Sequence, residues 1–274
     1  MSVEPASMRP LAAFSLESLA NIRGVLFDID DTLTTEGSLT ADAYAAMEAL
    51  KRAGLLVLPV TGRPAGWCDH IARMWPVDGV VGENGAFYFA FDHPDKKLKK
   101  RFVKSARERE VDRKRLTLVA ERILREVPGT ALASDQHYRE ADIAIDFCED
   151  VPALPREEIL RIHAIMEAEG LTAKISSIHV NGWFGGYDKL STTKLFMQER
   201  LHQDLDTHNA EFVFVGDSPN DQPMFAYFQH SAGVANVKNF LGLMSTGPAY
   251  VTGASFGAGF AELANALLAS RQAN

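Results

Sequence analysis

The sequence predicts an α/β protein in which a doubly wound parallel sheet carries an inserted α+β domain. Short apolar runs that end abruptly in polar residues indicate buried parallel strands, and helical patterns separate these runs along the chain. The insertion is predicted because the pattern changes after about Phe91 and returns near Ser191. With 274 residues, 46% of them hydrophobic, the chain is long enough for one large or two modest domains.

The first part of the chain alternates strands and helices with short connections. In chain order we expect a strand at the start of the stretch 25–33, a helix over 40–52, a strand over 55–60, a helix from 64 to about 75 and a strand over 79–81. Thr40 can cap the first helix, Gly54 ends it, and Pro64 suits the first position of the second helix. This order is typical of a doubly wound sheet.

The middle of the chain follows a different pattern. The expected elements are a solvated hairpin or loop for the basic run 96–101, a helix through about 127, a strand over 138–147, a helix over 155–169 and a strand over 172–180. Residues 138–147 alternate polar and apolar, as in a half-exposed strand. We therefore expect a first core part over 15–87, an inserted domain over 88–184 and a second core part over 185–274, with a frayed leader before about residue 15.

The last part of the chain returns to the core pattern. The expected elements are a helix over 191–205, a strand over 211–215, a helix over 219–228, a short strand near 233–234 and a final helix over 257–268.

Composition narrows the class of partner. The net charge of −8 and the pI of about 5.5 argue against a nucleic-acid or membrane-surface binder, and no apolar run reaches the length of a membrane span. The N-terminal ten residues lack the apolar core of a secretory signal. Cys68 and Cys148 match no metal or redox spacing, which favours reduced thiols in a cytoplasmic protein. The sequence leaves the oligomeric state open.

The most informative residues are three carboxylates, Asp28, Asp30 and Asp31, directly after the first expected strand. Neighbouring anions repel one another, so this arrangement is costly unless a cation or a hydrogen-bond network holds it. The carboxyl end of a parallel strand is where ligands bind in such sheets. Mg²⁺ with oxygen ligands is the simplest solution, and it indicates phosphate chemistry.

Three further groups fall at strand ends or helix starts: Thr61 with Gly62, a lysine near 189, and the pair Asp217 and Asp221. The set resembles the haloacid dehalogenase (HAD) superfamily. Its first motif, D-x-D-x-T, is matched by Asp28, Asp30 and Thr32. Thr61 corresponds to the second motif, a lysine before a helix to the third, and the run 216–221 to the fourth, G-D-x-x-x-D. The resemblance covers nearly the whole chain and implies a Rossmann-like core with a cap domain.

The resemblance also implies roles. Asp28 would be the nucleophile that forms an aspartyl-phosphate, and Asp30 the general acid and base. Thr61, Gly62 and Lys189 would bind the phosphoryl oxygens. Mg²⁺ would be held by four groups. These are the carboxylates of Asp28 and Asp217, the backbone carbonyl of Asp30, and Asp221 as a further or orienting ligand.

Two positions need comment. Asp31 stands where the family commonly has glycine, and we expect it to be a turn residue, since aspartate tolerates turn geometry. Lys189 and Lys194 both fit the third motif. We favour Lys189 because it precedes a helix that Ser191 or Thr192 could cap, whereas Lys194 would lie within that helix.

The insertion resembles the type-IIB cap, whose members are mostly sugar-phosphate phosphatases, together with phosphomannomutases. Asn84 is either a turn former or a substrate contact, and Arg63 is either a phosphate contact or an ion-pair partner in the acidic site. Arg139 and His179 flank expected cap strands, where they face either a sugar or solvent.

The leading hypothesis is a Mg²⁺-dependent phosphomonoester hydrolase acting on a small phosphorylated metabolite, with a sugar phosphate favoured. The alternative is a sugar-phosphate mutase of the same superfamily, which uses the same phosphoryl site. A signalling receiver also has an acidic cluster, a Thr and a Lys, but receivers are much shorter and have no large insertion. A catalytically inactive relative is disfavoured because both Asp28 and Asp30 are present.

Overall fold

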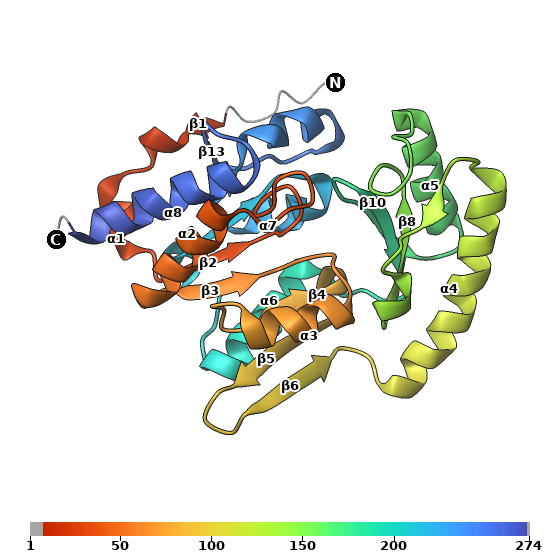
Figure 1. Cartoon of the computed structure of the whole chain (residues 1–274), viewed down its shortest axis with the longest axis horizontal. Helices are drawn as coiled ribbons and strands as arrows, with labels where there is room; N and C mark the ends of the chain where they lie inside the picture. The colour runs from red at the N-terminus through yellow and green to blue at the C-terminus, as the bar shows by residue number, and fades with distance from the viewer. Residues whose placement is uncertain (1–7, 273–274) are drawn as a thin grey trace.

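The computed structural model describes residues 8–272, and Figure 1 shows a parallel sheet with helices on both sides and a second domain beside it. The helices are α1 (Leu16–Asn21), α2 (Ala41–Arg52), α3 (Ala65–Met74), α4 (Ala106–Glu126), α5 (Arg156–Ala168), α6 (Lys189–Leu201), α7 (Gln222–Tyr227) and α8 (Phe256–Gln272). The strands are β1 (Arg9–Pro10), β2 (Gly24–Phe27), β3 (Leu56–Pro59), β4 (Val80–Gly82), β5 (Phe87–Asp92), β6 (Lys97–Phe102), β7 (Ala131–Leu132), β8 (Asp142–Asp146), β9 (Thr172–Ile175), β10 (His179–Trp183), β11 (Phe212–Gly216), β12 (His230–Gly233) and β13 (Tyr250–Val251).

The central sheet is entirely parallel and has the order β1-β13-β12-β11-β2-β3. Successive side chains of a strand point to opposite faces, so each strand feeds two apolar layers. On β2, Val25 and Phe27 belong to a cluster with residues of α2, α3 and α8, whereas Leu26 joins a cluster with residues of α6 and α7. Burial on both faces explains the continuous apolar runs in the sequence and confirms the doubly wound α/β prediction.

The antiparallel strands β4, β5 and β6 extend this core. A parallel bridge between Val60 and Val81 joins β4 to the end of β3, and β5 and β6 form a hairpin. Phe87 and Phe89 of β5 are fully buried in the core cluster, and Phe102 of β6 packs against it. We therefore propose that the inserted domain begins near residue 103 instead of at 88. The change of pattern after Phe91 marks the basic, exposed strand of a core hairpin.

The inserted domain has the order α4-β7-β8-α5-β9-β10, with an antiparallel sheet ordered β7-β8-β10-β9. Its apolar cluster lies between the sheet and the two helices, with Ile143 and Ile145 of β8 facing Ile123 and Ile162. The expectation that 138–147 is a half-exposed strand is wrong. All five residues of β8 are buried, because the core domain covers the polar face of the sheet.

Two boundaries differ from the expectations. The segment 172–180 is two strands, β9 and the start of β10, separated by a turn at residues 176–178. The part of the leader from Met8 onward is folded, since β1 pairs with β13; residues 1–7 lie outside the described residues. Over residues 8–272, none of the helices combines the length and the apolar character that crossing a membrane requires.

Candidate active site

The carboxyl ends of β2, β3 and β11 meet at one edge of the sheet. Asp28 directly follows β2, Thr61 lies two residues beyond β3, and Asp217 directly follows β11. The strand register places Phe27 opposite both Pro59 and Val215, and the N–H of Asp28 donates to the carbonyl of Val215 (2.9 Å). Residues from three distant parts of the sequence therefore share this edge.

The acidic cluster consists of Asp28, Asp217 and Asp221, all buried, with carboxylate oxygens within 4.8 Å of one another. Lys189 is the cation of this cluster: its Nζ donates to Asp28 Oδ1 at 2.8 Å and to Asp221 Oδ1 at 2.7 Å. Lys194, the other candidate for the third motif, pairs with Asp206 on the surface.

Lys189 is the first residue of α6, and its helix is capped differently from the expectation. Asp188 is the N-cap, and Ser191 completes a capping box from the third helical position. Ser191 and Thr192 are therefore not the cap. Thr192 instead donates from its hydroxyl to the carbonyl of Gly85, which fixes the start of the helix against the core.

The carboxylates of the cluster are held by their own hydrogen bonds. Asp217 accepts from the Thr32 hydroxyl at 3.1 Å and from Asn236 Nδ2 at 3.2 Å, and Asn236 also donates to the carbonyl of Asp31. Asp221 Oδ2 accepts from the N–H of Asp217 at 3.0 Å. Asn236 was not predicted as a site residue. The one indication in the sequence is its position as a polar residue just after the short strand expected near 233–234.

The electrostatics of the cluster suit a bound cation. Burial, together with the charges of Asp221 and Asp30, raises the pKa of Asp28 to about 8, although Lys189 opposes this shift. Burial and the neighbouring carboxylates also hold the pKa of Asp217 well above its usual range. If all three carboxylates are ionised, one lysine leaves two negative charges uncompensated. Oxygen donors with that charge fit a divalent cation such as Mg²⁺.

Asp31 is a turn residue, as expected. Its φ of 56° lies in the left-handed region that glycine adopts most easily and that aspartate tolerates in turns. Its N–H donates to the Thr34 hydroxyl at 3.0 Å.

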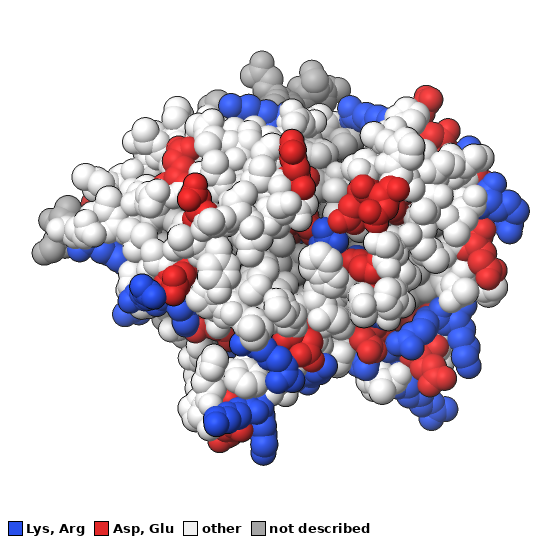
Figure 2. Space-filling model, in the orientation of Figure 1, with Lys and Arg blue, Asp and Glu red and all other residues white. Residues whose placement is uncertain are grey.

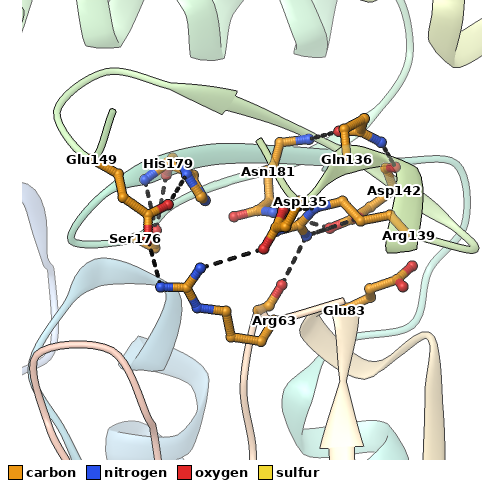
Figure 3. A network of polar contacts seen from close by, with 12 residues as sticks. Arg63, Glu83, Asp135, Gln136, Arg139, Asp142, Glu149, Ser176, His179 and Asn181 are labelled. Atoms are coloured by element: carbon orange, nitrogen blue, oxygen red, sulfur yellow. Dashed lines mark hydrogen bonds and ion pairs between the residues drawn. The ribbon is translucent and has the colours of Figure 1, made fainter. Parts of the chain in front are cut away.

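Arg63 forms ion pairs, which is one of the two roles expected for it. Figure 3 shows its side chain extending from the core toward the inserted domain. The guanidinium contacts Asp30 at 2.7 Å, Asp135 at 3.3 Å and Glu149 at 2.7 Å. Asp30 belongs to the core, whereas the other two carboxylates belong to the inserted domain. Arg63 therefore lies at the junction of the two domains.

Arg139 and His179 also belong to this junction, and neither is on a solvent-facing strand surface. Arg139 is buried and donates to the carbonyl of Gly62 at 2.9 Å and to Asp142 at 3.1 Å. His179 Nε2 lies 2.9 Å from Glu149 Oε2. Polar residues of the alternating segment 138–147, such as Arg139 and Asp142, thus face the core across the junction (Figure 3).

The turn Glu83–Gly85 connects three parts of the site. Glu83, Asn84 and Gly85 have φ values of 44°, 52° and 106°, a strained run that tertiary contacts must hold. The Glu83 carboxylate accepts from the N–H groups of Glu140 and Ala141 in the inserted domain. Asn84 is buried beside Gly62, and its Nδ2 has no partner among the described residues. It is both a turn residue and an available donor.

A small cavity of about 10 Å³ lies between the domains over Asp28. Its lining includes Asp28, Asp30, Gly62, Arg63, Arg139, Ser176, Ile178, His179, Asn181 and Asn220. A larger groove, about 350 Å³, lies beside α4 in the inserted domain and contains none of the acidic cluster. The smaller cavity is the one placed for chemistry at Asp28.

The chain is similar to known proteins in sequence over one part and in fold over most of its length. A family model for haloacid dehalogenase-like hydrolases matches residues 25–111. A search of curated proteins found no match. Among solved structures, the chain resembles a protein of Thermoplasma acidophilum (21% identity, TM-score 0.65, 90% of this chain and 98% of that one).

Two of the similar structures are those of phosphatases. The C-terminal domain of trehalose-6-phosphate phosphatase from C. albicans has 12% identity and a TM-score of 0.70, covering 97% of this chain and 99% of that one. The sucrose-phosphatase of Synechocystis, solved with sucrose and phosphate, has 14% identity and a TM-score of 0.60, covering 90% and 98%. At these identities the likeness concerns the fold.

The family model matches about a third of the chain, and the solved structures share its fold over most of its length. Both likenesses agree with the motif order of the haloacid dehalogenase-like hydrolases. We refer to the inserted domain below as the cap.

Proposed function

We propose that the protein is a Mg²⁺-dependent phosphomonoester hydrolase that acts through an aspartyl-phosphate on Asp28. The observation that carries this proposal is the buried cluster at the end of β2, where Lys189 contacts both Asp28 and Asp221 beneath a cavity closed by the cap. Carboxylate attack on a dianionic phosphate requires such charge compensation and alignment.

In the proposed first step, an oxygen of the Asp28 carboxylate forms a bond to phosphorus as the bond from phosphorus to the substrate oxygen breaks. Asp30 gives its proton to that leaving oxygen and then takes one from the water that hydrolyses the acyl phosphate. Lys189 favours the ionised form of Asp28 and would neutralise charge on the phosphoryl oxygens. Thr61 Oγ1 accepts from the N–H of Arg63 at 3.0 Å, which leaves its own hydrogen free for a phosphoryl oxygen.

The residues that would hold Mg²⁺ are Asp28, Asp217 and the backbone carbonyl of Asp30, with Asp221 orienting the group. Asp221 suits an orienting role, because its Oδ1 accepts from Lys189 and its Oδ2 from the N–H of Asp217. When bound, the ion would neutralise charge on the cluster and on the transferring phosphoryl group.

The surroundings of the cavity favour a phosphate ester of a neutral, polyhydroxylated molecule. Carboxylates outnumber cations around it, since Arg63 and Arg139 are already paired with Asp30, Asp135 and Asp142. A second anionic group on the substrate would find no free cation there among the described residues. Hydroxyl groups can instead use polar side chains of the lining. The sugar-phosphate phosphatases with this fold support the same substrate class.

No nucleic-acid partner is proposed. Figure 2 shows Lys and Arg mixed with Asp and Glu on the visible face, without a continuous basic surface, and the net charge is −8.

The direct experiment is a screen of sugar, polyol, nucleotide and glycolytic acid phosphates for release of inorganic phosphate with Mg²⁺. We expect steady release from a neutral sugar or polyol phosphate, none from Asp28→Asn, and no release in chelator. Asp69→Asn is the matched control and should behave as the wild type, because this half-buried aspartate of α3 pairs with Arg73 and Lys100 and does not line the cavity. Activity of Asp28→Asn near that of the wild type would exclude the nucleophile assignment. A requirement for a bisphosphate activator, with isomerised sugar as product, would identify the mutase alternative.

A further inference from the structure

Among residues 8–272, the guanidinium of Arg63 is the one cation that links Asp30 to the cap. Its side chain is 5% exposed, and it contacts one core carboxylate and two cap carboxylates, as Figure 3 shows for Asp135 and Glu149. The ring of Trp67 lies 4.5 Å from its guanidinium carbon. The arginine is therefore held from the core side by its neighbours and from the cap side by two acids.

The cap carboxylates have partners of their own within the cap. Asp135 also contacts Arg139 at 3.1 Å, and Glu149 also contacts His179 at 2.9 Å. These pairs fix the two acids in place before they meet Arg63. Asp30 differs, because among the described residues its one charged partner is Arg63. The position of the Asp30 carboxylate thus depends on where the cap holds the guanidinium.

The two oxygens of Asp30 are unequal. Both Nε and Nη2 of Arg63 approach Oδ1, at 2.8 and 2.7 Å, whereas Oδ2 accepts no hydrogen bond from residues 8–272. Oδ2 is therefore the oxygen left free to carry a proton. Asp28 and Asp30 both line the cavity in which the leaving oxygen of a substrate would lie.

We propose that Arg63 is a positioning residue that couples closure of the cap to the placement of the Asp30 carboxylate. The proposal rests on the proposed function, in which Asp30 transfers the proton of the leaving group. With the cap closed, Asp135 and Glu149 hold the guanidinium, which fixes Oδ1 and presents Oδ2 to the substrate. The proton then passes from Oδ2 to the leaving oxygen as the bond to phosphorus breaks. With the cap open, Arg63 loses both cap partners, and Asp30 loses its fixed position.

Stability alone does not account for this cluster. The attraction within a buried ion pair seldom exceeds the cost of removing its charges from water. A packed apolar junction would therefore hold the domains together at least as well. The cavity volume of about 10 Å³ has room for about one water molecule and is far below the range of about 300–1,000 Å³ typical of small-molecule sites. The cap must therefore open to admit substrate, and the Arg63 contacts to the cap must break and re-form in each turnover.

The first test compares two phosphate esters, p-nitrophenyl phosphate and an alkyl phosphate. The nitrophenolate leaves without help, whereas the alkoxide needs a proton, and general acid catalysis typically contributes about 10²- to 10⁴-fold. We expect Arg63→Gln to lose at least about tenfold more kcat on the alkyl ester than on the aryl ester. Glu149→Gln, which leaves the contact of Arg63 with Asp30 intact, should shift kcat in the same direction by a smaller factor. Arg122→Gln, a cap arginine paired with Glu126, is the matched control.

The second test measures cap opening without catalysis. The N–H groups of Glu140 and Ala141 donate across the junction to Glu83, so their hydrogen exchange reports opening. We expect severalfold faster exchange of both in Glu149→Gln and unchanged exchange in Arg122→Gln. This arm remains informative if Arg63→Gln does not fold.

The outcomes separate the two proposals. Equal losses of kcat on both esters, or unchanged exchange in Glu149→Gln, would overturn the coupling while phosphate release continued to support the hydrolase. If the wild type released phosphate from no ester, both the function and the role of Asp30 would fall. Exchange at Glu140 and Ala141 would then still show whether Glu149 holds the cap closed.

Discussion

The stability of the metal-free protein should fall as the pH rises from about 4 to 8, and Asp28 should account for a large part of this fall. Its pKa is raised from an ordinary value of 3.8 to about 8 in the folded chain. Between these values the folded state holds a proton that the unfolded state has lost. A rise in pH therefore favours unfolding, and the stability present below pH 3.8 is lost as the pH passes through 8.

The magnitude follows from the shift. Each pKa unit corresponds to about 1.4 kcal/mol, so the three units between pH 5 and pH 8 give about 4 kcal/mol as an upper bound. Asn has the shape of the carboxyl group but does not titrate. Asp28→Asn should therefore be more stable than the wild type at pH 8 in chelator, by up to about that amount, and should match it more closely at pH 5.

Urea unfolding at pH 5, 6.5 and 8, followed by circular dichroism in chelator and in excess Mg²⁺, measures this difference. Mg²⁺ should flatten the pH dependence of the wild type, because a bound cation compensates the ionised cluster, and should affect Asp28→Asn less. Parallel profiles for the two proteins in chelator would show that Asp28 does not titrate in this range and that its pKa is not raised to about 8.

Three further predictions concern the supports of the site. Gly85→Ala should lower the free energy of unfolding by more than about 2 kcal/mol, since a Cβ there would lie 2.0 Å from the carbonyl oxygen of Asp188, whereas Gly37→Ala, also at positive φ but in open space, should cost about 1 kcal/mol. Equal costs in urea unfolding would contradict the close approach. Lys189→Met should cost about 3–5 kcal/mol in chelator, part of it recovered with Mg²⁺, because it leaves buried carboxylates unpaired; a stability unchanged from the wild type would exclude that role. Burial raises the pKa of Glu149, but hydrogen bonds from His179 and Arg63 outweigh it and lower the pKa to about 2, so its stabilising contribution is present above about pH 4.5 and is lost as the pH falls toward 2. Glu149→Gln should accordingly lose less stability than the wild type between pH 4.5 and 3, and an identical acid profile would refute this.

The sequence sufficed for the parts of the fold that depend on local pattern. Buried strands such as β2 and β11 read as apolar runs because both of their faces are covered, and the residues that follow them reach one edge by topology alone. The choice of Lys189 over Lys194 also came from local position at a helix start. The structure places Lys189 in the cluster, and its role there stays a proposal.

The errors arose where tertiary contacts decide. The alternation in β8 was typical of a half-exposed strand, yet its polar residues are buried because the cap sheet lies against the core. The basic character of β6 led to the prediction that the β5–β6 hairpin belongs to the insertion. The burial of Phe87 and Phe89 in the core cluster supports our proposal that the hairpin belongs to the core. The partners of Arg63 lie 33, 72 and 86 residues away, beyond any local pattern.

The turn Glu83–Gly85 has a consequence for building new enzymes from this chain. Its first residue binds the cap through Glu140 and Ala141, and its last lies against the carbonyl that precedes Lys189. A cap transplanted from a relative would have to form its own contact with this tripeptide, whether or not substrate is bound. Chimeras should therefore move the tripeptide together with the segment 140–141, and keep the host's helix α6 only where its start accepts the same glycine.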